Sequence, residues 1–131
     1  NVSERFLNYV KYGTQSDITS STVPSTKGQL VLAARLADEL KALGITDAHT
    51  DENGYVYGHI PAEGLHGACL ALIAHMDTAM DMSGDNIKPR IIRNYDGNDI
   101  VLNEEKHIVT AVSVFPNLKT FVGQDLIVTD G

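Results

Sequence analysis

The chain has 131 residues, of which 43% are hydrophobic, and its 17 acidic and 10 basic residues give a formal net charge of −7. The length is enough for one domain with its own core, and the acidity argues against a nucleic-acid partner, because such binding relies on Lys and Arg at phosphates. No apolar run approaches the roughly 20 residues that a membrane helix needs, and no secretory leader is visible, so a membrane partner is not expected either.

Two helices are predicted in the first third of the chain. Residues 3–12 carry apolar side chains at helical spacing, and the serine that opens them can act as the N-cap. Residues 26–43 form the stronger pattern, because leucines and alanines make one apolar stripe and Gly44 is a natural C-cap. Thr26 followed by Gln29 indicates a capping box at the start of this second helix.

Short strands and turns are predicted in much of the rest of the chain. Residues 45–50 and 55–60 should form a hairpin, since the Asp-Glu-Asn-Gly sequence between them has the composition of a tight turn. Further strands are expected at residues 91–92, 100–102, 107–109 and 126–129, and a short helix at 115–123.

The most informative segment is an apolar run that ends in a histidine. Residues 70–74 read Leu-Ala-Leu-Ile-Ala, a composition that predicts a strand buried on both faces. His75 and Asp77 would then lie at the carboxyl end of that strand, where open α/β sheets place their ligands. A neutral imidazole there can bind a divalent metal, and a nearby carboxylate can hold the imidazole in one tautomer or take part in chemistry itself. On spacing alone, a His-x-Asp triplet is a weak signal.

The other metal-binding or nucleophilic side chains are expected to have no such role. Cys69 is the only cysteine, so no internal disulfide is possible. We expect it to be a small core residue at the start of the buried strand. A lone cysteine also fits a reducing cytoplasm. Four histidines are interpreted as bystanders rather than ligands: His49, His59, His66 and His107.

The order of these segments, and the amino-acid sequences of several of them, resemble those of one enzyme family. The matching stretches are residues 4–10 (ERFLNYV), 23–29 (VPSTKGQ), 74–78 (AHMDT), 83–89 (SGDNIKP), 94–100 (NYDGNDI) and 126–131 (LIVTDG). They make the chain similar to the zinc exopeptidases of the M20 type, and within that family to aminopeptidases that act on tripeptides. The resemblance covers essentially the whole chain, in order.

The resemblance implies an α/β fold, a zinc-exopeptidase-like catalytic domain with a mixed β-sheet flanked by helices. It implies that residues 1–131 are the N-terminal part of that domain, incomplete and without a second domain. His75 would be a metal ligand and Asp77 a catalytic residue beside it, in a site that holds two zinc ions in the complete enzyme. A zinc site needs about three or four protein ligands and the motif supplies one, so this chain alone should bind zinc weakly or not at all.

A glutamate pair is a hallmark of the family, in which one glutamate is the general base and its neighbour binds metal. Glu104 and Glu105 form such a pair in this sequence. The secondary-structure element before them is not the one that precedes the family's glutamate pair, and they come much too early in the chain. We therefore interpret Glu104 and Glu105 as residues of a solvated turn.

By this resemblance, the complete enzyme would release the N-terminal residue from short peptides, tripeptides in particular. It would act in the cytoplasm, and the full-length enzyme could form a homodimer. Two other readings stay open. One is a related M20-type amidohydrolase or carboxypeptidase, which the downstream sequence and a substrate panel would separate. The other is a non-catalytic binding domain that kept the fold, which would be separated by whether the gene continues past Gly131 with further ligands.

Overall fold

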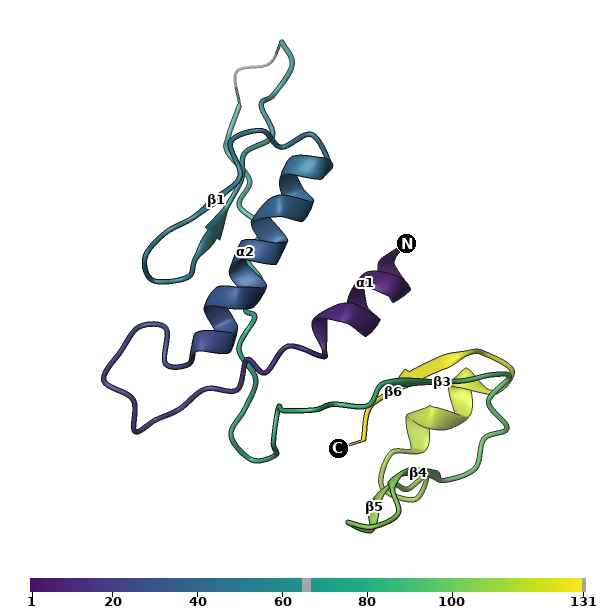
Figure 1. Ribbon diagram of the computed structural model, residues 1–131. Coiled ribbons are helices and arrows are strands. Elements are labelled where there is room, and N and C mark those ends of the chain that lie inside the picture. Colours follow the sequence, from purple (N-terminus) through teal and green to yellow (C-terminus); the bar gives the residue numbers. More distant parts are fainter. Residues whose placement is uncertain (65–66, 131) are drawn as a thin grey trace. The chain divides into compact units, whose positions relative to one another are not determined.

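The computed structural model describes residues 1–64 and 67–130, and these fall into two compact units, each described by itself. One unit comprises Tyr12–Asp85, and the other comprises Asn1–Lys11 with Asn86–Gly131. Figure 1 shows their helices and strands, most of them labelled.

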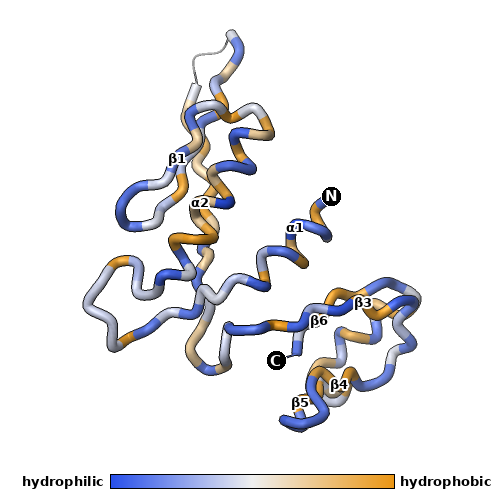
Figure 2. Tube along the Cα trace, in the orientation of Figure 1, coloured by the Kyte–Doolittle hydropathy of each residue, from blue (hydrophilic) through white to orange (hydrophobic). Residues whose placement is uncertain are grey.

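A long helix is the centre of the Tyr12–Asp85 unit. α2 spans Lys27–Ala42, with Leu43 as its C-cap and Gly44 at φ +97° immediately after it. The predicted helix is therefore confirmed, and so is its end at Gly44. A residue with positive φ after the C-cap is a common helix ending, and glycine adopts that conformation without steric cost. Figure 2 shows apolar and polar residues alternating along α2, as expected for a helix with one buried face.

A short hairpin packs against the buried face of α2. β1 (His49–Thr50) pairs antiparallel with β2 (Val56–Tyr57), which confirms the predicted hairpin, although both strands are shorter than expected. Both strands contact α2. The residues that are at most 5% exposed in this small core are Leu32, Ala33, Ala37 and Ala48. This packing is local, since all its parts lie within about 30 residues of the chain.

The start of α2 differs from the prediction. Thr26 is the N-cap residue, but its side chain makes no capping hydrogen bond, so the predicted capping box is wrong. The Thr26 hydroxyl instead donates to the Gln15 carbonyl at 2.9 Å, and the Gln29 amide donates to the Thr14 carbonyl at 3.3 Å. Both side chains are used to hold the incoming loop, because that loop lies directly against the helix N-terminus.

The predicted buried strand at residues 70–74 is wrong in this structure. No strand is assigned there, and Leu70, Leu72 and Ile73 are 82%, 90% and 94% exposed. Cys69, expected in the core, is exposed as well. A strand exists only where its backbone pairs with a neighbour, and no strand in the described residues pairs with this segment.

The other unit begins with a helix that is capped differently from the prediction. α1 spans Val2–Tyr9, and its N-cap is Asn1 rather than Ser3. The Asn1 side chain accepts the Glu4 backbone N–H at 2.9 Å, and the Glu4 carboxylate accepts from the Asn1 amino group at 2.8 Å. This reciprocal pair is a capping box, which explains why the N-cap lies two residues earlier than predicted.

Two small antiparallel sheets make up the rest of this unit. β3 (Arg90–Ile92) pairs with β6 (Leu126–Val128), and β4 (Ile100–Asn103) pairs with β5 (Ile108–Thr110). A 3₁₀ helix, η1, spans Pro116–Phe121 where a short helix was predicted. The predicted strands are therefore confirmed in position. Tyr95, in the segment between β3 and β4, and Ile100, the first residue of β4, are buried apolar residues of this unit.

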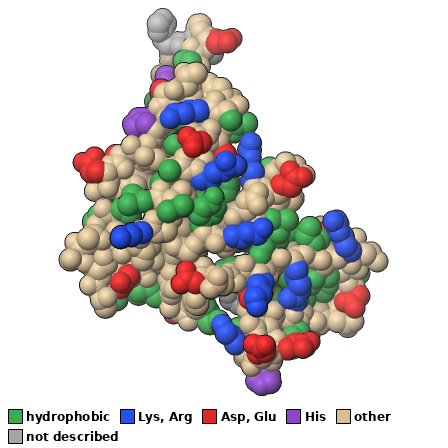
Figure 3. All heavy atoms as spheres, in the orientation of Figure 1, with side chains coloured by type: hydrophobic (Ala, Val, Ile, Leu, Met, Phe, Trp, Pro, Cys, Tyr) green, Lys and Arg blue, Asp and Glu red, His purple; other side chains and the backbone are tan. Residues whose placement is uncertain are grey.

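The described residues hold three separate two-stranded antiparallel sheets and no mixed sheet. The expected single mixed sheet flanked by helices is therefore not what this structure shows, although helices and strands are both present, as an α/β fold requires. A mixed sheet would need the 70–74 segment as a paired strand. Apolar side chains also reach the molecular surface, as Figure 3 shows.

No helix in residues 1–64 or 67–130 is long and apolar enough to cross a membrane.

Candidate functional site

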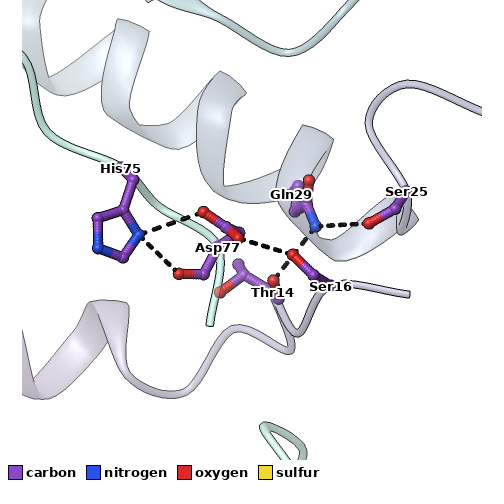
Figure 4. A network of polar contacts seen from close by, with 6 residues as sticks. All are labelled: Thr14, Ser16, Ser25, Gln29, His75 and Asp77. Carbon is purple, nitrogen blue, oxygen red and sulfur yellow. Dashed lines mark hydrogen bonds and ion pairs between the residues drawn. The ribbon is translucent and has the colours of Figure 1, made fainter. Parts of the chain in front are cut away.

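The two residues singled out from the sequence, His75 and Asp77, contact each other. His75 Nδ1 lies 3.0 Å from the Asp77 backbone oxygen and 3.2 Å from its carboxylate Oδ1 (Figure 4). A backbone oxygen can only accept, so Nδ1 carries the proton and, in the neutral ring, Nε2 carries the lone pair. The His75 side chain is 85% exposed, which leaves Nε2 open to a ligand.

A third residue, which the sequence did not indicate, holds the carboxylate. The Ser16 hydroxyl donates a 2.7 Å hydrogen bond to Asp77 Oδ2. Figure 4 shows the Asp77 carboxylate between this hydroxyl and the imidazole, so that its two oxygens serve two different donors. The Ser16 hydrogen bond, followed by the smaller influence of His75, lowers the pKa of Asp77 below its ordinary value. Asp77 is therefore an ionised acceptor at neutral pH.

The backbone brings Ser16 to Asp77. The Ser16 N–H donates to the Thr78 carbonyl at 3.0 Å, and the Thr78 N–H donates to the Thr14 carbonyl at 3.2 Å. These two bonds form a parallel bridge between Gln15 and Thr78. The loop at residues 14–16 is thus fixed beside the His-x-Asp segment, although about 60 residues separate the two in sequence.

The same loop is tied to the N-terminus of α2. The buried Gln29 side chain donates to the Thr14 carbonyl and to the Ser25 hydroxyl, each at 3.3 Å. Thr26 adds its bond to the Gln15 carbonyl. These contacts attach the site to the most regular element of the unit.

An open concavity of 440 Å³ adjoins this network. Its lining includes Ser16, the residue that binds the Asp77 carboxylate. The other lining residues are Gly13, Gln15, Asp17, Thr26, Met80 and Asp85.

The donor set fits one ligand position of a metal site and not a complete site. His75 offers Nε2 with its tautomer fixed from the other side, which is the usual arrangement of a metal-binding histidine. The described residues contain no group of three or more His, Cys, Asp or Glu side chains that could hold a metal ion. A zinc site takes about four ligands, so the described residues by themselves do not form one.

The residues interpreted as bystanders lie on the surface where the structure describes them. His49, His59 and His107 are exposed, and His66 lies outside the described residues. Glu104 and Glu105 are exposed in the turn between β4 and β5, which confirms the solvated-turn interpretation.

The chain is similar to curated peptidases. These relatives are named peptidase T. This chain is 55% identical to the protein from Caldanaerobacter subterraneus subsp. tengcongensis, 51% identical to that of Halothermothrix orenii and 50% identical to that of Clostridium acetobutylicum. Each match covers 131 residues, which is 99% of this chain and 32% of the relative. No family model matches the chain.

These matches confirm that the chain is similar to peptidase T over its whole length. The chain spans about a third of the length of the curated relatives it matches.

Proposed function

We propose that this chain is part of a metal-dependent aminopeptidase that releases the N-terminal residue from short peptides, with tripeptides as the substrate class. The observation that carries the proposal is the His75 ring, whose Nδ1 is bound by Asp77 and whose Nε2 is free and exposed. The similarity to proteins named peptidase T over the whole chain supports it.

In this proposal, His75 holds one of two zinc ions through Nε2. When bound, zinc in such a site supplies an activated water and a Lewis acid for the scissile carbonyl. Asp77 would keep the His75 ring in the correct tautomer, and its carboxylate beside the ring is the group proposed to act in catalysis. A general base would have to come from another part of the longer protein, because Glu104 and Glu105 are interpreted as residues of a solvated turn.

We further propose that residues 1–131 are the N-terminal part of a catalytic domain whose other ligands come from the rest of a longer protein. The relatives are about three times as long as this chain, which supports the proposal. The exposed apolar segment at residues 70–74 supports it too, because a run of such side chains normally has a partner. A cytoplasmic location, suggested by the lone cysteine, and a homodimer remain parts of the same proposal.

The test uses the full-length protein that contains this chain. His75→Ala should lose one metal ion per site and nearly all hydrolysis of tripeptides, because the described residues hold no group of His, Cys, Asp and Glu side chains that could bind the metal in its place. His59→Ala, which changes an exposed histidine outside the network, should keep both. Metal analysis and kinetics on the two variants decide, and full metal content with near-normal turnover in His75→Ala would overturn the proposal.

The isolated 131-residue chain provides a second test. Because it offers one ligand where zinc needs about four, it should bind zinc weakly or not at all and should not hydrolyse tripeptides. Calorimetric titration that finds tight, stoichiometric zinc binding would contradict this. A panel of amides and C-terminally cleaved peptides would separate a related amidohydrolase or carboxypeptidase, and a full-length protein without metal would indicate a non-catalytic domain.

A further inference from the structure

Asp77 needs a fixed orientation to do what its position beside His75 suggests. Its side chain is 47% exposed, and an exposed aspartate ordinarily samples several rotamers. His75 cannot supply the constraint, because its own side chain is 85% exposed. The Ser16 hydroxyl is the remaining partner of the carboxylate, and its 2.7 Å distance is that of a strong bond from a hydroxyl to a charged oxygen.

Ser16 is able to act as a fixed point because its own backbone is anchored. Its N–H is bound to the Thr78 carbonyl, one residue after Asp77, and the return bond runs from the Thr78 N–H to Thr14. The hydroxyl is therefore presented from a backbone that is itself tied to the segment carrying the carboxylate.

That backbone is tied in turn to α2. Gln29, which is 7% exposed, binds the Thr14 carbonyl, and Thr26 binds the Gln15 carbonyl. Hydrogen bonds thus connect the first turn of α2 to the backbone of residues 14 and 15, and the next residue, Ser16, binds Asp77, which in turn binds His75 (Figure 4).

We propose that Ser16 is a positioning residue of this site, which holds the Asp77 carboxylate in the rotamer that keeps the His75 ring oriented with Nε2 outward. The catalytic consequence rests on the proposed function, since the orientation of His75 matters for turnover only when the ring binds a metal. The orientation itself does not rest on it. The competing explanation is that Ser16 merely fastens the loop to the neighbouring segment.

The experiment measures the orientation directly in the isotope-labelled chain. Three-bond couplings give the χ1 rotamer of Asp77, and ¹⁵N shifts of the His75 ring, at a pH where the ring is neutral, give its tautomer. The variants are Ser16→Ala, which removes the hydroxyl, and Ser16→Thr, which keeps it. Ser113→Ala, an exposed serine of the other unit, is the matched control. If Ser16→Ala does not fold, Ser16→Cys replaces it, because a thiol is nearly isosteric and only a weak donor.

We expect one Asp77 rotamer in the wild type, in Ser16→Thr and in Ser113→Ala, and rotamer averaging in Ser16→Ala with the His75 tautomer shifted toward Nε2–H. A single rotamer retained in Ser16→Ala, with only the backbone amide signals of the loop displaced, would overturn the proposal in favour of a fastening role.

In the full-length protein, Ser16→Ala should lower kcat about 10–100-fold with KM little changed, as for other losses of outer-shell support, and Ser16→Thr should restore most of it. The two proposals can fail separately. Freed Asp77 rotamers in a protein that proves not to be a metal-dependent peptidase would leave the positioning role standing. An unchanged rotamer in an active metallopeptidase would remove only the positioning role.

Discussion

The carbonyl of Gly13 lies so close to Gly28, in the first turn of α2, that a Cβ added to Gly28 would stand 1.6 Å from the Gly13 oxygen. Real Cβ atoms do not approach a backbone oxygen so closely, so the absence of a side chain at Gly28 is what lets the loop pack against the helix. The loop that carries Ser16 starts from this contact.

Gly28→Ala should therefore destabilise the chain. In an ordinary helical position, Gly→Ala stabilises by about 0.5–1 kcal/mol, because it reduces the entropy of the unfolded chain. Here the clash with a backbone atom should outweigh that gain, and we expect a net loss of about 1–3 kcal/mol, the usual range for overpacking. Denaturant unfolding followed by circular dichroism measures it.

Gly67→Ala is the matched control for this substitution, because a Cβ at Gly67 meets nothing within 4 Å and the residue has no positive φ. Its unfolding midpoint should stay close to that of the wild type. Equal midpoints for Gly28→Ala and Gly67→Ala would contradict the close approach between the loop and α2.

α2 could be predicted from the sequence because everything that specifies it is local. Its apolar stripe and the glycine that ends it lie within about 18 residues, and both are confirmed. The burial of residues 70–74 could not be predicted in the same way. An apolar composition shows what a strand would bury, but burial depends on neighbouring strands, and the described chain supplies none for this segment.

The reactivity of Cys69 can show whether the 70–74 segment gains partner strands in the full-length protein. It is the only cysteine and is exposed, so in the 131-residue chain a thiol reagent should label it at a rate similar to that of the denatured chain. In a full-length protein in which the 70–74 segment gains partner strands, we expect labelling to slow at least about tenfold, as for a thiol that is accessible only through local opening. Equal labelling rates in both proteins would argue against such partners.

The pH dependence of stability in the other unit should depend on Asp125. Its carboxylate accepts the Asn94 backbone N–H at 3.0 Å and also binds Arg93, and these contacts, in that order, lower the pKa of Asp125 below its ordinary value of 3.8. A group whose pKa is lower in the folded state stabilises the fold above its unfolded pKa, and that contribution is lost as the pH falls through the folded pKa.

Asp125→Asn should therefore be less stable than the wild type at neutral pH, and the difference should shrink as the pH falls below about 4. Unfolding titrations at a series of pH values measure the difference. Asp81→Asn, an exposed aspartate of the Tyr12–Asp85 unit, serves as control. A difference that stays constant down to pH 2 would show that the loss comes from packing and not from the charge.

The candidate site was predictable only in part. His75 and Asp77 are two positions apart and follow an apolar run, so their pairing could be inferred from the sequence, and the structure brings them into contact. Ser16 could not be inferred, since it lies 61 positions from Asp77 in a Ser/Thr-rich loop with no pattern of its own. Long-range backbone pairing places it there, and that pairing has no local signal.

The distinct roles proposed for His75 and Asp77 lead to the final prediction, made for the full-length protein. Asp77→Ala removes the carboxylate but leaves the His75 ring free to coordinate, and the Asp77 backbone oxygen still accepts from Nδ1. We therefore expect Asp77→Ala to retain most of its bound metal while kcat falls by about 10–100-fold, or by more if the carboxylate acts directly in catalysis.

Asp77→Asn, which can still accept a hydrogen bond but carries no charge, separates the two contributions. Turnover near the wild-type level in Asp77→Asn would assign Asp77 to orienting the ring alone, whereas a loss as large as that of Asp77→Ala would assign its effect to the negative charge. Loss of metal from both variants, equal to that of His75→Ala, would contradict the assignment and make Asp77 a ligand itself.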